Sequence, residues 1–172
     1  MAIIKEVRGF KPVIGNDCFI AETAAVIGDV KMGDNCSIWY GTVLRGDVNS
    51  ITIGNNVNIQ DGAVVHTLYQ RSKTVIGDNV SIGHNATIHG ATIKSNSLVG
   101  MGATVLDNAG VESGAIVAAN ALVTSGMRVE SGWIYAGVPA KKIKEVSPGQ
   151  QKEIVERIAN DYIMYASWYK TN

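Results

Sequence analysis

An aliphatic residue recurs every six positions from Ile76 to Val129, in the run IGDNVSIGHNATIHGATIKSNSLVGMGATVLDNAGVESGAIVAANALVTSGMRV, with one residue omitted before Ile93. A period of six fits neither an α-helix, which repeats every 3.6 residues, nor a hairpin meander interrupted by loops of changing length. It fits a coil in which each group of six residues, a hexad, forms one short strand and one corner. The aliphatic residue of each hexad, its anchor, then points into the coil.

The same period extends toward the N-terminus and covers most of the chain. A small or β-branched residue stands four positions after most anchors, as at Ala86, where it would fill the narrow angle of a corner. Glycine often follows the anchor, as at Gly33 and Gly77, and we expect positive φ at these crowded corners. The sequence predicts an all-β fold, a parallel β-helix of hexapeptide repeats. Its anchors are Ile14, Ile20, Val26, Met32, Ile38, Leu44, Ile53, Ile59, Val65, Ile76, Ile82, Ile88, Ile93, Val99, Val105, Val111, Val117, Val123 and Val129.

The regularity resembles that of the left-handed β-helix proteins, which have three hexads, or about eighteen residues, per coil. That resemblance implies a left-handed coil, against the general preference for right-handed crossovers. We expect residues 1–134 to form the left-handed β-helix and residues 135–172 to form a linker and a C-terminal α-helix packed on it. Ser147 and Pro148 are a good N-cap and first helical residue, so the helix should run from about Pro148 to Lys170. Its apolar stripe is Ile154, Val155, Ile158, Tyr162, Tyr165 and Tyr169.

Charge and composition exclude several classes of partner. Fifteen Lys and Arg residues balance fifteen Asp and Glu residues, which favours neither nucleic acid nor an anionic membrane. No apolar run has the length of a membrane span, and the start MAIIKEVRGFKP lacks the features of a signal peptide. We therefore expect a cytoplasmic protein. Cys18 and Cys36 should stack in successive coils and stay reduced there, although strand spacing would allow a disulfide between them.

All three histidines, His66, His84 and His89, lie within 24 residues of one another. Imidazole is the usual base or metal ligand near neutral pH, so three in one stretch indicate a shared use. Residues 65–75 count as one hexad with an inserted loop. With three hexads per coil, His66 and His89 then stack on one face of adjacent coils. Arg45, one coil earlier, belongs to the same face.

His84 falls on a different face of the predicted coil, with Asp61 one coil before it and Gln60 beside Asp61. Two stacked imidazoles can share one metal ion, but the third cannot easily join them within one chain. A site with three imidazoles would therefore need His84 of another copy. A closed ring of subunits meets that need, and three faces per coil favour a homotrimer. Three neutral imidazoles leave zinc a fourth position for water, which is the arrangement of a catalytic site.

At these residues the chain resembles the γ-class carbonic anhydrases, and the likeness covers nearly its whole length. The matching segments are Arg45-Gly46-Asp47, Asn58-Ile59-Gln60-Asp61-Gly62 and Val65-His66, followed by His84 and His89. The resemblance implies a trimeric enzyme that reversibly hydrates carbon dioxide to bicarbonate by metal-bound hydroxide, with Zn²⁺ or alternatively Fe²⁺ between subunits. It also implies the residue roles. His66, His84 and His89 are the ligands, and Gln60 hydrogen-bonds the bound water or product. Arg45, Asp47 and Asp61 hold the interface and orient the site, and Tyr162 is offered to the pocket by the C-terminal helix.

The sequence departs from that family where protons leave the site. The best-studied members carry glutamates near the metal that pass the proton to solvent. Here Val48 follows Asp47, and the loop 67–74 contains no carboxylate. Metal binding is unaffected by this difference, but the resemblance then predicts slow turnover.

Two other classes of function stay open. Hexapeptide-repeat acyltransferases share the coil, use a single histidine as general base and carry a segment resembling 137–141 near their ends; an acyl-CoA thioesterase belongs to the same alternative. A non-enzymatic binding protein, for a siderophore-type ligand, is the other. Fold alone does not separate these.

Overall fold

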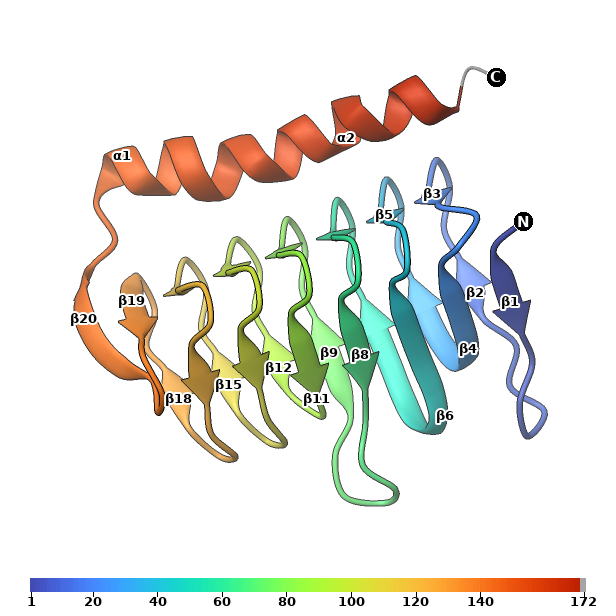
Figure 1. Cartoon of the computed structure of the whole chain (residues 1–172), viewed down its shortest axis with the longest axis horizontal. Coiled ribbons are helices and arrows are strands. Elements are labelled where there is room, and N and C mark those ends of the chain that lie inside the picture. The colour runs from blue at the N-terminus through green and yellow to red at the C-terminus, as the bar shows by residue number, and fades with distance from the viewer. Residues whose placement is uncertain (171–172) are drawn as a thin grey trace.

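The computed structural model describes residues 1–170, in which parallel strands wind into a β-solenoid of about seven turns (Figure 1). The chain passes three faces in each turn. Two long strands, β4 (Ala25–Met32) and β6 (Val43–Ile53), each bend from the first face into the second. The predicted parallel β-helix of hexapeptide repeats is therefore confirmed.

The strands of each face stack in register along the solenoid. The first face contains β1 (Ile3–Lys5), the starts of β4 and β6, β8 (Val64–His66), β11 (Thr87–His89), β14 (Thr104–Val105) and β17 (Leu122–Val123). The second contains β2 (Val13–Ile14), the ends of β4 and β6, β9 (Thr74–Ile76), β12 (Thr92–Ile93), β15 (Gly110–Val111) and β18 (Arg128–Val129). The third contains β3 (Phe19–Ile20), β5 (Ser37–Ile38), β7 (Asn58–Ile59), β10 (Ser81–Ile82), β13 (Leu98–Val99), β16 (Ile116–Val117), β19 (Trp133–Ala136) and the antiparallel β20 (Lys141–Glu145).

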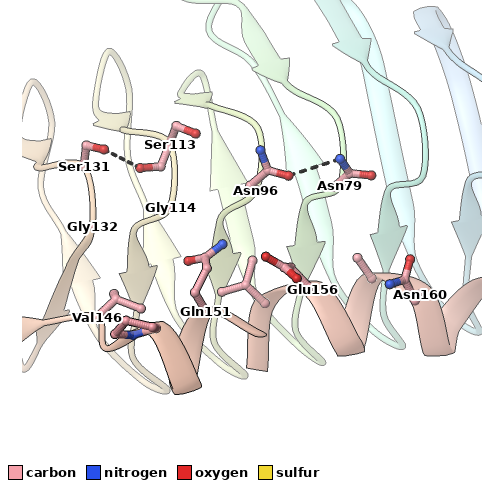
Figure 2. A pocket seen from close by; sticks show the side chains of 13 residues that line it. Asn79, Asn96, Ser113, Gly114, Ser131, Gly132, Val146, Gln151, Glu156 and Asn160 are labelled. Carbon is pink, nitrogen blue, oxygen red and sulfur yellow. Dashed lines mark hydrogen bonds between the residues drawn. The ribbon is translucent and has the colours of Figure 1, made fainter. Parts of the chain in front are cut away.

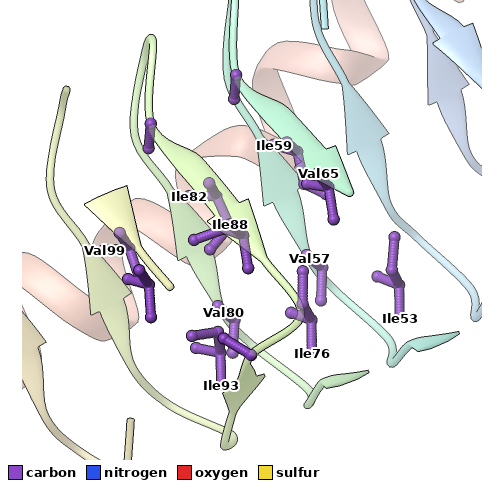
Figure 3. Close-up of a cluster of buried hydrophobic side chains, with 14 of the residues drawn as sticks. Ile53, Val57, Ile59, Val65, Ile76, Val80, Ile82, Ile88, Ile93 and Val99 are labelled. Atoms are coloured by element: carbon purple, nitrogen blue, oxygen red, sulfur yellow. The ribbon is translucent and has the colours of Figure 1, made fainter. Parts of the chain in front are cut away.

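The anchors form the core of the solenoid. Ile59, Ile82 and Val99 lie one above another on the third face and are fully buried (Figure 3). Alanines such as Ala86 fill the corners beside them, also fully buried. Because the strands are in register, each anchor packs on the equivalent anchor of the next coil, about 4.8 Å away.

The expectation of positive φ at the glycines that follow the anchors is wrong. Positive φ falls instead on asparagines two residues further along, such as Asn35 and Asn79, because asparagine tolerates the left-handed region. Gly33 and Gly77 serve close approach: a Cβ at Gly77 would lie 2.6 Å from the backbone nitrogen of Ser95 in the next coil. Glycine is therefore required there by the neighbouring coil and not by its own backbone conformation.

The predicted C-terminal helix is confirmed and begins at Pro148. It consists of α1 (Pro148–Gln150), the π-helical η1 (Gln151–Glu156), which the sequence did not predict, and α2 (Arg157–Tyr169). Ser147 caps it: its side-chain oxygen accepts from the Gln150 backbone N–H at 3.2 Å, and Gln150 Oε1 accepts from the Ser147 N–H at 3.1 Å. Before it, β19 continues the third face to Ala136, past the boundary placed at residue 134.

The helix contacts the solenoid unevenly. The end of α2 packs by aromatic contacts on the first coils, with Tyr169 against Phe19 and Tyr162 against Trp39. Near α1 and η1 a cavity of about 610 Å³ separates helix and coil, lined by polar residues such as Asn96, Ser113 and Gln151 and by apolar ones such as Val155 (Figure 2). The aromatic end therefore docks the helix.

The structure also describes the two cysteines and the length of the helices. Cys18 and Cys36 are both free thiols. A hydrogen bond from Cys36 lowers the pKa of the Cys18 thiol to about 7, although burial opposes this. No helix within residues 1–170 is long and apolar enough to cross a membrane.

The stacked anchors should carry most of the stability. Replacing Ile82, which is fully buried, by alanine should lower the free energy of unfolding by about 2–5 kcal/mol, because it opens a cavity between two coils. Ile143→Ala is the matched control on exposed β20 and should change it by about 0.5 kcal/mol or less. Urea titration of both variants measures this. Equal losses in the two would contradict a stability held in the anchors.

Candidate metal centre

His66 and His89 are direct neighbours on the first face. They occupy the same position of β8 and β11, as hexad counting predicted. Their ring centroids lie 5.1 Å apart, and Nδ1 of His66 lies 3.2 Å from Nε2 of His89. Both rings are partly buried.

Each of these imidazoles has a carboxylate on its other nitrogen. Asp47 Oδ1 lies 3.0 Å from Nε2 of His66, and both oxygens of Asp107 lie 3.0 Å from Nδ1 of His89. Because an ionised carboxylate only accepts hydrogen bonds, the ring protons sit on those two nitrogens. The facing nitrogens, Nδ1 of His66 and Nε2 of His89, therefore both present lone pairs. Two lone pairs at 3.2 Å repel each other unless a proton or a metal ion lies between them.

The geometry of this pair fits a metal ion. Two nitrogens bound to one tetrahedral zinc at about 2.0–2.1 Å lie about 3.3 Å apart. The observed 3.2 Å between His66 and His89 is close to that edge. Imidazoles that bind metals usually donate their second N–H to a carboxylate, as both rings do here.

The charges around Asp47 support an ionised carboxylate and a neutral imidazole. Burial alone would raise the pKa of Asp47, but hydrogen bonds from Arg45, at 2.6 Å, and from His66 hold it below its usual value. Burial lowers the pKa of His66, and the nearby Arg45 charge lowers it further, against the opposing hydrogen bond to Asp47. A neutral imidazole is the form that binds metal.

His84 lies at the corner between the third and first faces, two residues after the anchor Ile82. Its Nδ1 is 2.9 Å from Oδ2 of Asp61, and its backbone N–H donates to Oε1 of Gln60 at 3.2 Å. The hydroxyl of Tyr162, from α2, lies 3.5 Å from Nε2 of His84. Burial raises the pKa of Tyr162 to about 12, so this phenol is neutral.

The predicted site residues therefore form two groups in one chain. The first is Arg45, Asp47, His66 and His89; the second is Gln60, Asp61, His84 and Tyr162. Among residues 1–170, His, Cys, Asp and Glu form no group of three or more that could hold a metal ion.

Sequence reasoning missed Asp107 and Ser72. Hexad counting stacks Leu106 on His89, because the coil after His89 is one residue short, so Asp107 lies one position past the neighbour that the register gives, and its contact with His89 does not follow from the count. Ser72 donates to Oδ1 of Asp107 at 2.5 Å. It lies in the inserted loop 67–74, where no anchor fixes the register.

The chain is similar to proteins of known family and structure. The family described as bacterial transferase hexapeptide (six repeats) matches residues 11–46 and 73–107. A solved putative acetyltransferase from Bacillus cereus is 36% identical, with a TM-score of 0.96, over 99% of this chain and 98% of that one.

Several relatives are named carbonic anhydrases, and two of them show the range of coverage. Gamma carbonic anhydrase 2, mitochondrial, of Arabidopsis thaliana is 44% identical over 90% of this chain, which spans only 57% of that relative. The carbonic anhydrase of Geobacillus kaustophilus is 37% identical over 95% of this chain and 88% of its own length. The chain therefore belongs to the γ-carbonic-anhydrase-like group of the hexapeptide-repeat family.

Proposed function

We propose that the protein is a homotrimeric metalloenzyme that reversibly hydrates carbon dioxide to bicarbonate. In this proposal His66 and His89 of one chain and His84 of a neighbouring chain hold one Zn²⁺ or Fe²⁺ ion. The observation that carries it is the pair of facing nitrogens of His66 and His89, each with its N–H directed at a carboxylate. The metal, when bound, lowers the pKa of coordinated water to about 7, which suits attack on carbon dioxide near neutral pH.

The chain's own residues orient the site. Asp47 and Asp107 fix the rings of His66 and His89, and Asp61 fixes His84 through Nδ1, so that the lone pair lies on Nε2, 3.5 Å from the Tyr162 hydroxyl. Gln60 is buried and hydrogen-bonded to Asn58 and to the His84 backbone, which holds its amide close to His84 for contact with substrate or product.

In a trimer, two columns of side chains on the surface of one chain would face the matching columns of its neighbours. The face column contains Arg45, His66, His89 and Leu106, each directly after a first-face anchor. The corner column contains Asp61, His84 and Met101, each two residues after a third-face anchor. If His84 of a neighbour lies level with the space between His66 and His89, the equal rise of parallel coils fixes the other pairs. Asp61 of the neighbour then lies level with the space between Arg45 and His66, and Met101 of the neighbour lies level with the space between His89 and Leu106.

The lack of shuttle glutamates bears on rate. With Val48 after Asp47 and no carboxylate in the loop 67–74, we infer that proton export limits turnover. Tyr162, whose hydroxyl lies beside His84, keeps its proton because its pKa is raised to about 12, and so does not replace them as a base near neutral pH.

One observation favours a second candidate, acyl transfer. Asp61 holds Nδ1 of His84 at 2.9 Å and leaves the lone pair on Nε2, which is the arrangement of a histidine general base, although the Tyr162 hydroxyl lies 3.5 Å from that nitrogen. A solved relative of high similarity carries the name putative acetyltransferase. The two functions differ in their need for His66 and His89, because an acyltransferase would need only His84.

Metal analysis distinguishes them. Protein purified without oxygen should contain about one zinc or iron(II) ion per chain and hydrate carbon dioxide. His66→Ala and His89→Ala should each lose both the metal and the hydration activity, because each removes one of three ligands. Elemental analysis and a stopped-flow hydration assay measure this. Metal content that survives both substitutions would refute the metal centre. Acyl transfer that depends on His84 alone would establish the second candidate.

Met101 tests the alignment of the two columns. It is 57% exposed in a single chain, and in the proposed trimer it packs between His89 and Leu106 of a neighbour. Met101→Asp should therefore weaken the trimer and lower its metal content by placing a buried charge against an apolar side chain. Ile143→Asp, also 57% exposed but on β20, is the matched control and should do neither. Sedimentation velocity with metal analysis reads both effects. A fully loaded, unweakened Met101→Asp trimer would show that the columns are misaligned.

A further inference from the structure

Each histidine of the face column is hydrogen-bonded to a carboxylate, and the two carboxylates have different partners on their far side. Asp47, behind His66, is anchored by a cation, because Arg45 contacts it at 2.6 Å. Asp107, behind His89, is anchored by a neutral hydroxyl, because Ser72 Oγ donates to its Oδ1 at 2.5 Å. Asp47 therefore shares its charge with Arg45, whereas Asp107 directs both oxygens at His89.

Ser72 is held rigidly by the inserted loop 67–74. Its side chain is buried, and its Oγ accepts from the Leu68 N–H at 3.1 Å while its own N–H donates to the Leu68 carbonyl at 3.2 Å. The end of the loop is fixed as well. Thr74 Oγ1 donates to the backbone carbonyl of His66 at 2.7 Å and accepts from the Gly90 N–H at 3.1 Å. The loop is thus joined to the backbone at or beside both histidines.

Gly90, directly after His89, makes room for this arrangement. It has φ of +59°, and a Cβ there would collide with the Ser72 hydroxyl and the Asp107 carboxylate. Ser72 and Asp107 can approach the backbone beside His89 only because this residue is glycine.

Asp107 is ionised in this setting. An Asp carboxyl is ionised at neutral pH, and here it accepts from the Ser72 hydroxyl at Oδ1 and has both oxygens 3.0 Å from Nδ1 of His89. The carboxylate is therefore an acceptor only, and the proton of a neutral His89 lies on Nδ1.

We propose that Asp107 and Ser72 are positioning residues, through which the loop 67–74 holds His89 with Nε2 free and aimed at the metal. This inference rests on the proposed function, because positioning His89 matters only if His89 binds a metal. The tautomer of His89, however, can be measured in metal-free protein. It also assigns a role to the loop 67–74, which contains no carboxylate that could pass protons to solvent.

The first measurement is the tautomer of His89 in metal-free protein. Nitrogen-15 NMR at alkaline pH, with the three histidines assigned by single substitutions, should show His89 protonated on Nδ1 in the wild type. Asp107→Ala should shift it toward the Nε2-protonated form, and Ser72→Ala should do so in part. Asp107→Asn keeps a carbonyl acceptor and should retain more of the Nδ1-protonated form than Asp107→Ala does. A tautomer that stays unchanged in Asp107→Ala and Ser72→Ala would overturn the proposal.

The second measurement is zinc affinity by competition with a chromophoric chelator. Asp107→Ala should bind zinc about 10–100-fold more weakly than wild type, and Asp107→Asn and Ser72→Ala should fall between the two. The matched controls are Asp78→Asn and Ser97→Ala, which remove a carboxylate and a buried hydroxyl hydrogen-bonded elsewhere on the solenoid. They should bind zinc as wild type does. Circular dichroism confirms folding of each variant.

These results separate two failures. If Asp107→Ala and Ser72→Ala bind zinc like the controls, the positioning role is wrong and the metal centre stands. If the wild type binds no zinc, the proposed function fails, and the tautomer of His89 alone decides the role of Asp107 and Ser72.

Discussion

In-register stacking of short parallel strands is the constraint on which the rest of this structure depends. Each coil donates its backbone hydrogen bonds to the next, so a residue and its equivalent one coil later are held about 4.8 Å apart. The sequence is thereby converted into columns of side chains. The same rule that buries Ile59, Ile82 and Val99 in the core places His66 on His89 at the surface.

The columns also explain why one chain carries a site that needs another chain. A face column and a corner column are separated by the anchors between them, so His84 cannot join His66 and His89 within one coil. What one chain does provide is two lone pairs held 3.2 Å apart, with both ring protons directed at Asp47 and Asp107. This arrangement is electrostatically incomplete, and in our proposal the cation and the neighbour's imidazole complete it together. In that proposal trimer assembly and metal binding are coupled equilibria, so that weakening one weakens the other.

How much the sequence predicts follows from the same periodicity. The fold, the stacking of His66 on His89 and the placement of His84 beside Asp61 and Gln60 all follow from counting hexads, because the anchors fix the register. The role of Asp107 does not follow from that count, because the register stacks Leu106 on His89 and leaves Asp107 one position further along. Ser72 is out of reach as well, because the inserted loop has no anchor and its position depends on local hydrogen bonds to Leu68 and Asp107. The π-helical η1 is likewise invisible in the sequence, since its residues read as ordinary helix formers.

The central claim is that the three imidazoles meet only between chains, and co-expression of His84→Ala with His89→Ala tests it most directly. Each variant alone should form trimers without a three-histidine site. In any mixed trimer, one His84→Ala chain still offers His66 and His89 next to a His89→Ala chain that still offers His84. Mixed trimers should therefore regain about one third of the wild-type metal content, bound by three imidazoles. Mixed trimers that form and bind no metal in this way would contradict the account.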